Sequence, residues 1–257
     1  MVPDTHRAFA VFGPRLLKGV ALVALATSGL LLTGCSVVRA VNKVAHDVEG
    51  NKATIDAFTN KMSSGNSTPF EAIYMTTGSA PATIVYAVLP PKGLAFTDTP
   101  SGPTSTTGGE INSFRIVVNS LGEYACTPPT SSSGSWQCEK LSGANATAEN
   151  KIFAFYTPSH WKAFLSDFAL AAGFAGDKVS SSSMSVNGFS MSCVDLVAPG
   201  QPGTSRICTT SQGILGYVKV AGDSTSFELR SYSSSPQSSL FQLPPGAKIS
   251  VPPTTTT

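Results

Sequence analysis

The segment Leu32-Thr33-Gly34-Cys35 divides this chain of 257 residues into a leader and a part that folds. Before it, Arg7, Arg15 and Lys18 supply positive charge, and residues 19–31 form an apolar run without a charge. A basic segment, a short apolar segment and small residues at a cleavage point together make a secretory signal. The apolar run is shorter than the roughly 20 residues that a transmembrane helix needs. We therefore expect an exported protein rather than one with a permanent transmembrane anchor.

Cys35 directly follows the small residues, and here the segment resembles the lipobox of bacterial lipoproteins. The resemblance implies that residues 1–34 are a signal peptide and that Cys35 becomes the first residue of the mature chain. The thiol of Cys35 would carry a diacylglycerol, with acyl chains such as palmitate. It implies a cell-envelope protein that is lipid-anchored to the outer face of the cytoplasmic membrane, or alternatively to the outer membrane. The competing interpretation is an ordinary signal peptide that happens to precede a cysteine.

The charge balance excludes one class of partner. The formal net charge is +2. The leader accounts for this excess, because residues 1–34 hold three Lys or Arg residues and one acidic residue. The remaining chain is neutral and has no basic cluster that would attract nucleic acid or anionic lipid head groups. We expect no nucleic-acid partner, and any contact with the membrane is expected to pass through the lipid anchor.

Four further cysteines suit an oxidising compartment, where an even number predicts disulfides. Cys126 and Cys138 flank a segment rich in Pro and Ser, and Cys193 and Cys208 flank one rich in Pro and Gly. Of the three possible connectivities, only this pairing closes two short loops within hairpins, each contributing about 3 kcal/mol in the chain-entropy model. A metal site would require closely spaced Cys or His ligands, which are absent here. We expect no metal and no other cofactor.

The periodicity of apolar residues predicts two helices among about ten strands. Residues 35–65 form an amphipathic helix beginning at the lipid, and the central helix spans about 157–174, where Thr157-Pro158 has the form of an N-cap followed by a first-turn proline. Residues 66–250 otherwise alternate as strands with short hairpin links, which favours an antiparallel sheet. One face of such a sheet must be covered, and the two helices are the elements available for this. Residues 251–257 are expected to be a disordered tail.

Two short segments resemble a known family of exported proteins. Residues 208–217 (CTTSQGILGY) and 241–248 (FQLPPGAK) look like the strand-turn-strand segment and the closing phrase of the LolA/RseB/LppX-LprG-like proteins, which bind lipids or lipoproteins. The resemblance implies an α+β fold: a curved antiparallel β-sheet (half-barrel) with helices covering the concave face. It also implies an apolar cavity between sheet and helices. The ligand would be a lipid or an acylated molecule.

The central helix supplies candidate ligand-binding residues. An apolar stripe with the spacing i, i+3, i+4 and i+7 lies on this helix, beside two phenylalanines that precede it. The candidates are Phe153, Phe155, Trp161, Phe164, Leu165 and Phe168. The same stripe would equally serve an ordinary buried helix. Two functions therefore stay open: a carrier or sensor of an apolar ligand, and a non-catalytic structural or protein-interaction lipoprotein with an envelope protein as its partner.

Catalytic motifs are weak in this sequence. Residues 159–162 (SHWK) match the Ser-x-x-Lys pattern of penicillin-recognising enzymes, but no Lys-Thr-Gly follows. Nucleophile elbows, nucleotide-binding loops and zinc-protease motifs do not occur. We therefore expect a protein that is not an enzyme.

Overall fold

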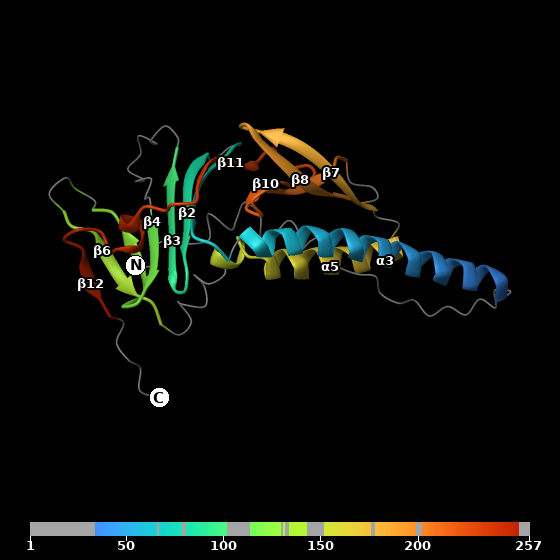
Figure 1. Cartoon of the computed structure of the whole chain (residues 1–257), viewed down its shortest axis with the longest axis horizontal. Coiled ribbons are helices and arrows are strands. Elements are labelled where there is room, and N and C mark those ends of the chain that lie inside the picture. Colours follow the sequence, from blue (N-terminus) through green and yellow to red (C-terminus); the bar gives the residue numbers. More distant parts are fainter. Residues whose placement is uncertain are drawn as a thin grey trace, which may run out of the picture.

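A computed structural model describes residues 34–65, 67–78, 81–101, 114–129, 131, 134–142, 152–175, 178–198 and 202–251. The side chains of residues 34–49 and 168–175 lie outside this description. The described chain forms one sheet of twelve strands and two long α-helices (Figure 1). Two expectations concern residues that lie outside this description. They are the signal peptide, of which residues 1–33 are not described, and the disordered tail, of which residues 252–257 are not described.

The element labels follow Figure 1. The helices are α3 (Gly34–Gly65), α5 (Pro158–Ala175) and the short 3₁₀ helix η1 (Ser238–Phe241). The strands are β1 (Phe70–Thr76), β2 (Ala82–Leu89), β3 (Gly93–Pro100), β4 (Phe114–Asn119), β5 (Gly122–Thr127), β6 (Gln137–Lys140), β7 (Lys178–Val186), β8 (Phe189–Val197), β9 (Ser205–Thr210), β10 (Leu215–Lys219), β11 (Ser226–Ser233) and β12 (Lys248–Ser250).

The prediction of a half-barrel covered by helices is wrong. The structure is mostly β, with a single open and curved sheet in the order β12-β6-β5-β4-β3-β2-β1-β11-β10-β9-β8-β7. Helix α3 packs against β7, β8 and β9, and α5 packs against α3 and β7. Twelve strands span roughly 50 Å across the sheet, whereas two adjacent helices are each only about 10 Å wide. Two helices therefore cannot cover a sheet of this width, and they lie toward one end of it (Figure 1).

Alternating side chains of the central strands build the main core. In β1, Phe70, Ala72 and Tyr74 are buried while the intervening residues are partly exposed. The antiparallel register places Tyr86 of β2 opposite Ala72 and Ile84 opposite Tyr74, so these side chains share one face. Side chains of successive residues in a strand point to opposite faces, so this alternation buries one face of the central strands.

The opposite face of the same strands is covered by the end of the chain. We call residues 237–250 the C-terminal strap. Phe241 of this strap is buried against Ala87 and Ala95. The Arg115 guanidinium on β4 donates hydrogen bonds to the carbonyls of Ser239 and Leu240, and the Asn119 amide donates to the carbonyl of Phe241. The strap ends in β12, which pairs in parallel with β6.

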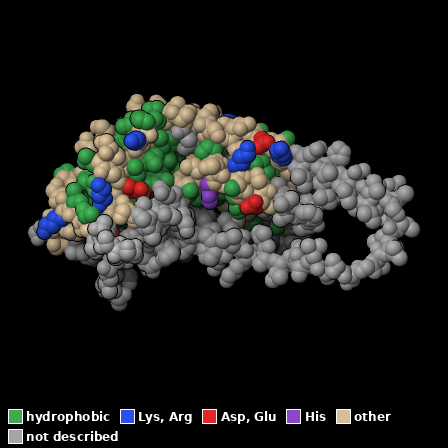
Figure 2. Space-filling view, turned by 90° about the horizontal axis from the view of Figure 1, so that it is seen from below, with side chains coloured by type: hydrophobic (Ala, Val, Ile, Leu, Met, Phe, Trp, Pro, Cys, Tyr) green, Lys and Arg blue, Asp and Glu red, His purple; other side chains and the backbone are tan. Residues whose placement is uncertain are grey.

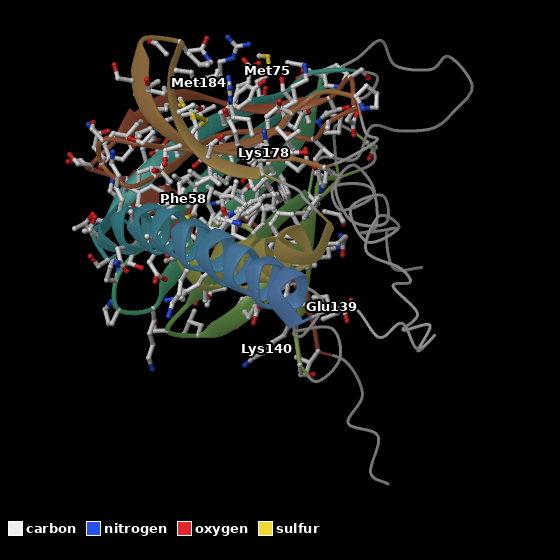
Figure 3. All side chains as sticks on the ribbon, turned by 90° about the vertical axis from the view of Figure 1, so that its right-hand side faces the viewer. Phe58, Met75, Glu139, Lys140, Lys178 and Met184 are labelled. Carbon is white, nitrogen blue, oxygen red and sulfur yellow. A yellow bond between two sulfur atoms is a disulfide. The ribbon has the colours of Figure 1, made fainter. Side chains whose placement is uncertain are left out.

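A close backbone contact joins α3 to the far half of the sheet. Gly65 ends α3, and Gly213 lies in the turn between β9 and β10 with a φ of +79°. A Cβ at Gly213 would lie 2.2 Å from the carbonyl oxygen of Lys61, and one at Gly65 would lie 2.5 Å from the backbone at Gly213. Two glycines therefore let the helix end lie directly on the turn. Phe58 of α3 is buried, and its side chain lies between the helix and the sheet (Figure 3).

Candidate functional site

The structure places the predicted anchor at the start of the first described helix. Helix α3 begins at Gly34, and the side chain of Cys35 lies outside the described part. Within the described residues, none of the helices is both long enough and apolar enough to cross a bilayer. The N-terminal part of α3 extends past the end of α5 (Figure 1).

Both predicted disulfides are present. Cys126 and Cys138 lie opposite each other on β5 and β6, and Cys193 and Cys208 lie opposite each other on β8 and β9. Each disulfide therefore joins two neighbouring strands. They lie in opposite halves of the sheet, one near the β12 edge and one near the β7 edge.

The candidate ligand-binding residues of the central helix lie in a dense aromatic cluster. Trp161 and Leu165 are buried, Phe164 is half-buried, and the side chain of Phe168 lies outside the described part. The indole Nε1 of Trp161 donates a hydrogen bond of 2.7 Å to the carbonyl of Phe155. Edge-to-face contacts join the Trp161 ring to Phe155 at 5.3 Å and to Phe164 at 5.9 Å between centroids.

The two residues that precede the helix belong to the same cluster. Phe153 is buried, with its ring 6.3 Å from Tyr86, and Phe155 packs edge-to-face on Phe227 at 5.3 Å. The described candidates therefore contact one another and the sheet.

Sequence reasoning missed the tyrosines that complete this cluster. Tyr156 stacks on Tyr86 with ring centroids 4.1 Å apart, and Tyr74 stacks on Phe227 at 4.4 Å. These rings belong to β1, β2, β11 and the turn before α5, which lie far apart in the sequence. The sequence pattern predicted strands around Tyr74 and Tyr86, but it did not predict which rings meet between them.

A buried carboxyl group lies on the same sheet face. Asp98 of β3 pairs with Ile84 and Phe114 on its two neighbouring strands, and its Oδ1 is buried without a hydrogen-bond partner among the residues that the structure describes. Burial raises the pKa of Asp98 to about 6. Burial, and then the neighbouring Tyr74, Tyr86 and Asp98, raise the pKa of Tyr156 well above its usual value. The deprotonated form of Asp98 is therefore destabilised in the folded protein.

This carboxyl group predicts a pH-dependent stability. Because its folded pKa of about 6 lies above the unfolded value near 3.9, folding favours the protonated acid. The contribution of Asp98 to stability should be largest below about pH 4 and should be lost as the pH rises through 6, by about 2–3 kcal/mol. Asp98→Asn should remove this loss and raise the free energy of unfolding at pH 8. Urea unfolding from pH 4 to 8 tests this, with Asp167→Asn, at an exposed residue of α5, as control. An unchanged pH slope in Asp98→Asn would contradict it.

The residues of the Ser-x-x-Lys match make other contacts in the structure. Lys162 pairs with Asp56 of α3 at 3.2 Å, and the Ser159 hydroxyl lies 3.2 Å from that of Thr157. Burial lowers the pKa of His160, whose ring lies edge-on to Trp161. Among the residues that the structure describes, His, Cys, Asp and Glu form no group of three that could hold a metal ion.

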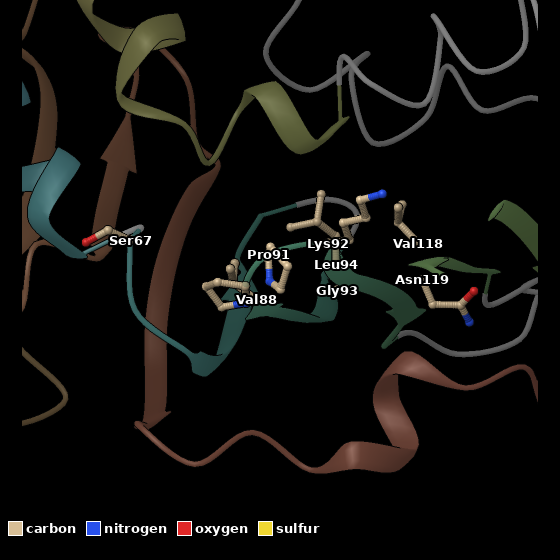
Figure 4. Close-up of a pocket in the computed structure, with 9 residues that line it drawn as sticks. Ser67, Val88, Pro91, Lys92, Gly93, Leu94, Val118 and Asn119 are labelled. Carbon is tan, nitrogen blue, oxygen red and sulfur yellow. The ribbon is translucent and has the colours of Figure 1, made fainter. Parts of the chain in front are cut away.

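An open pocket of about 450 Å³ lies where β2 turns into β3 (Figure 4). Its apolar walls come from Val88, Leu94 and Val118 and from the turn prolines Pro90 and Pro91, and Lys92 adds a positive charge. Apolar side chains also gather on the face of the molecule seen from below (Figure 2). A second pocket of about 300 Å³ lies between α3 and α5 and is lined by Thr59, Asn60, Ser63, Pro158, Ser159 and Lys162.

Sequence reasoning also missed the residues that hold the C-terminal strap. Arg115 and Asn119 appear in the sequence as ordinary polar residues of a strand, yet they bind backbone carbonyls more than 120 residues away. The segment of residues 241–248 stood out in the sequence only through its resemblance to a family. It did not indicate that Arg115 and Asn119 would bind the backbone there.

Comparison with known proteins gives no further identification. No protein-family model matches the chain, and no curated protein is significantly similar to it.

Proposed function

We propose that this protein is an exported lipoprotein, anchored through Cys35, whose sheet domain binds a partner protein of the cell envelope without catalysis. The observation that supports it best is the packing around α5. The side chains expected to line a ligand cavity contact one another and the sheet, as the 4.1 Å stacking of Tyr86 on Tyr156 illustrates. Closely packed rings leave little room for a lipid tail. An open apolar pocket remains available at the surface.

The geometry of α3 fits a protein held at a membrane. A helix of 32 residues is about 48 Å long. It begins beside the proposed lipid-carrying cysteine and ends at the sheet, with no flexible linker between them. Its first turns project beyond α5 (Figure 1). Such a helix would hold the sheet and its pocket away from the bilayer, where another envelope protein can reach them.

The surface pocket is the proposed contact for this partner. Its volume of about 450 Å³ leaves room for apolar side chains of a partner, which would contact Val88, Leu94 and Val118 in its lining. Interface centres of this kind are apolar and are surrounded by polar groups. Lys92 at the turn supplies such a polar group and would favour a partner with an acidic residue beside its apolar side chains.

The pocket contact is tested by photo-crosslinking in intact cells. A photoreactive phenylalanine analogue replaces Lys92, and as control replaces Lys52, an exposed residue of α3. We expect one discrete protein adduct at position 92 and none at position 52. Adducts to lipid alone at position 92, or the same adducts at both positions, would contradict the proposed contact.

The lipid anchor predicts the fate of Cys35→Ala. Because each buried CH₂ of an acyl chain contributes about 0.8 kcal/mol, two or three chains hold the protein firmly on the membrane. Wild type should stay in the membrane fraction in high salt, whereas Cys35→Ala should remain unprocessed or appear in the medium. Fractionation and immunoblotting measure this, with Ser36→Ala as the neighbouring control. Release of wild type by salt alone would show that no lipid anchor is present.

A further inference from the structure

The two edges of the sheet differ in a way that points to an interaction. At one edge, β12 has only three residues, and Pro252-Pro253 follow it in the sequence. Short strands and prolines are common means of protecting a sheet edge against pairing with another chain. At the other edge, β7 has nine residues, contains no proline and carries one charge, at Lys178. The edge at β7 therefore lacks the protection that the β12 edge has.

Strand β7 also presents its outer side to the surface. It pairs with β8 along all nine residues, and among the described strands none pairs with its other side. An edge strand leaves alternate backbone N–H and C=O groups without a partner in the sheet. Most of its side chains are small serines, of which Ser180, Ser181, Ser183 and Ser185 are exposed. Small side chains allow another backbone to approach closely.

We infer that β7 pairs antiparallel with β7 of a second copy of this chain, so that two sheets join at their unprotected edges. The register that pairs all nine residues is centred on Ser182, which then faces Ser182 of the second copy. Ser181 faces Ser183 of the second copy. Residues directly opposite each other in this register point to the same side of the joined sheet, as antiparallel pairing requires.

The single charge of β7 is compatible with this self-pairing. In the register centred on Ser182, Lys178 lies opposite Val186 of the second copy. The two Lys178 side chains are then at opposite ends of the pair, about 27 Å apart, so they do not repel each other strongly. Figure 3 shows Lys178 and Met184 along β7, the first near the helices and the second away from them. Helices α3 and α5 both contact β7, and Ser180, Ser181, Ser183 and Ser185 of the strand stay exposed beside them.

The oligomeric state of the full chain tests this inference. Sedimentation velocity in mild detergent should show a dimer that dissociates on dilution. The double variant Ser181→Lys/Ser183→Lys places like charges directly opposite each other in two pairs, and it should weaken dimerisation by roughly two- to thirty-fold. The control Ser190→Lys/Ser231→Lys changes two exposed serines away from the edge and should leave it unchanged. A monomeric wild type at about 100 µM, or equal weakening in the control, would overturn the inference.

Hydrogen exchange gives a second readout that needs no variant. In wild type, the amides of residues 178–186 that point outward should become more protected as the protein concentration rises from dissociating to dimerising conditions. Amides of β12 should not change. If the protection of β7 does not depend on the protein concentration, pairing with a second copy is overturned. Protection by a strand from a different protein would give this result.

Discussion

Gly213→Ala is expected to lower the free energy of unfolding by at least about 3 kcal/mol. Gly213 has a φ of +79°, which costs about 1–2 kcal/mol for a residue with a Cβ. The added Cβ would also lie 2.2 Å from the carbonyl oxygen of Lys61 and 2.8 Å from the backbone nitrogen of Gly65. Backbone atoms at the end of a helix cannot move aside without separating α3 from the sheet. Urea unfolding of the oxidised protein measures the loss.

Gly222→Ala is the matched control for this variant. Gly222 has a similar φ of +75° in the turn between β10 and β11, but a Cβ there would meet no atom within 4 Å. Its substitution should therefore cost only the backbone term of about 1–2 kcal/mol. Equal losses in the two variants would show that the contact between α3 and the β9–β10 turn contributes nothing to stability.

Trp161→Ala is expected to lower the free energy of unfolding by about 3–5 kcal/mol, because it removes a large buried side chain from a filled core. Trp161 is 3% exposed, contacts Phe155 and Phe164, and donates a hydrogen bond to a backbone carbonyl. Leu165→Ala, at a side chain that is 0% exposed, should cost about 2–5 kcal/mol for the same reason.

Phe164→Ala provides the comparison within the same helix. Phe164 is half-buried, so its truncation should cost clearly less than that of Trp161. If these side chains lined a ligand cavity instead, truncation of Trp161 would cost well under 3 kcal/mol while the binding of an apolar ligand weakened. Urea unfolding of the three variants distinguishes the two arrangements.

Local features of this fold were accessible from the sequence. The pairing of Cys126 with Cys138 and of Cys193 with Cys208 followed from short loops between hairpin strands, and both disulfides are present. The antiparallel pairing of neighbouring strands followed from the hairpin links. These features depend on residues close in sequence, where spacing and turn composition determine the outcome.

The extent of the sheet was not accessible in the same way. Strand alternation shows that one face is buried, but it does not show how many strands share a sheet or what covers them. The strap bound by Arg115 and Asn119 covers part of the second face, and β12 joins β6 in parallel from more than 100 residues away. The half-barrel prediction was wrong because the sheet has more strands than two helices can cover, and because the strap covers part of its second face.

The candidate site shows the same limit. The stripe of Trp161, Phe164 and Leu165 is apolar in either arrangement, since a cavity wall and a filled core require the same residue types. The residues that pack against the stripe and its neighbouring rings decide whether it lines a cavity or fills a core. Tyr74, Tyr86 and Phe227 belong to this packing, and they come from strands that are distant from the helix in the sequence. Gly213 belongs to the segment 208–217, which the sequence connected only with a family. The structure shows its physical role, which is to let α3 approach the turn closely.

Native mass spectrometry of the full chain tests the central claim most directly. Cys35→Ala protein is collected from the medium without detergent and weighed intact, so that any bound molecule is separate from the anchor. The filled aromatic core predicts the mass of the polypeptide with two disulfides and no stoichiometric apolar molecule. One lipid or acylated molecule per chain, lost when Trp161 is replaced by Ala, would contradict the account and identify the protein as a carrier.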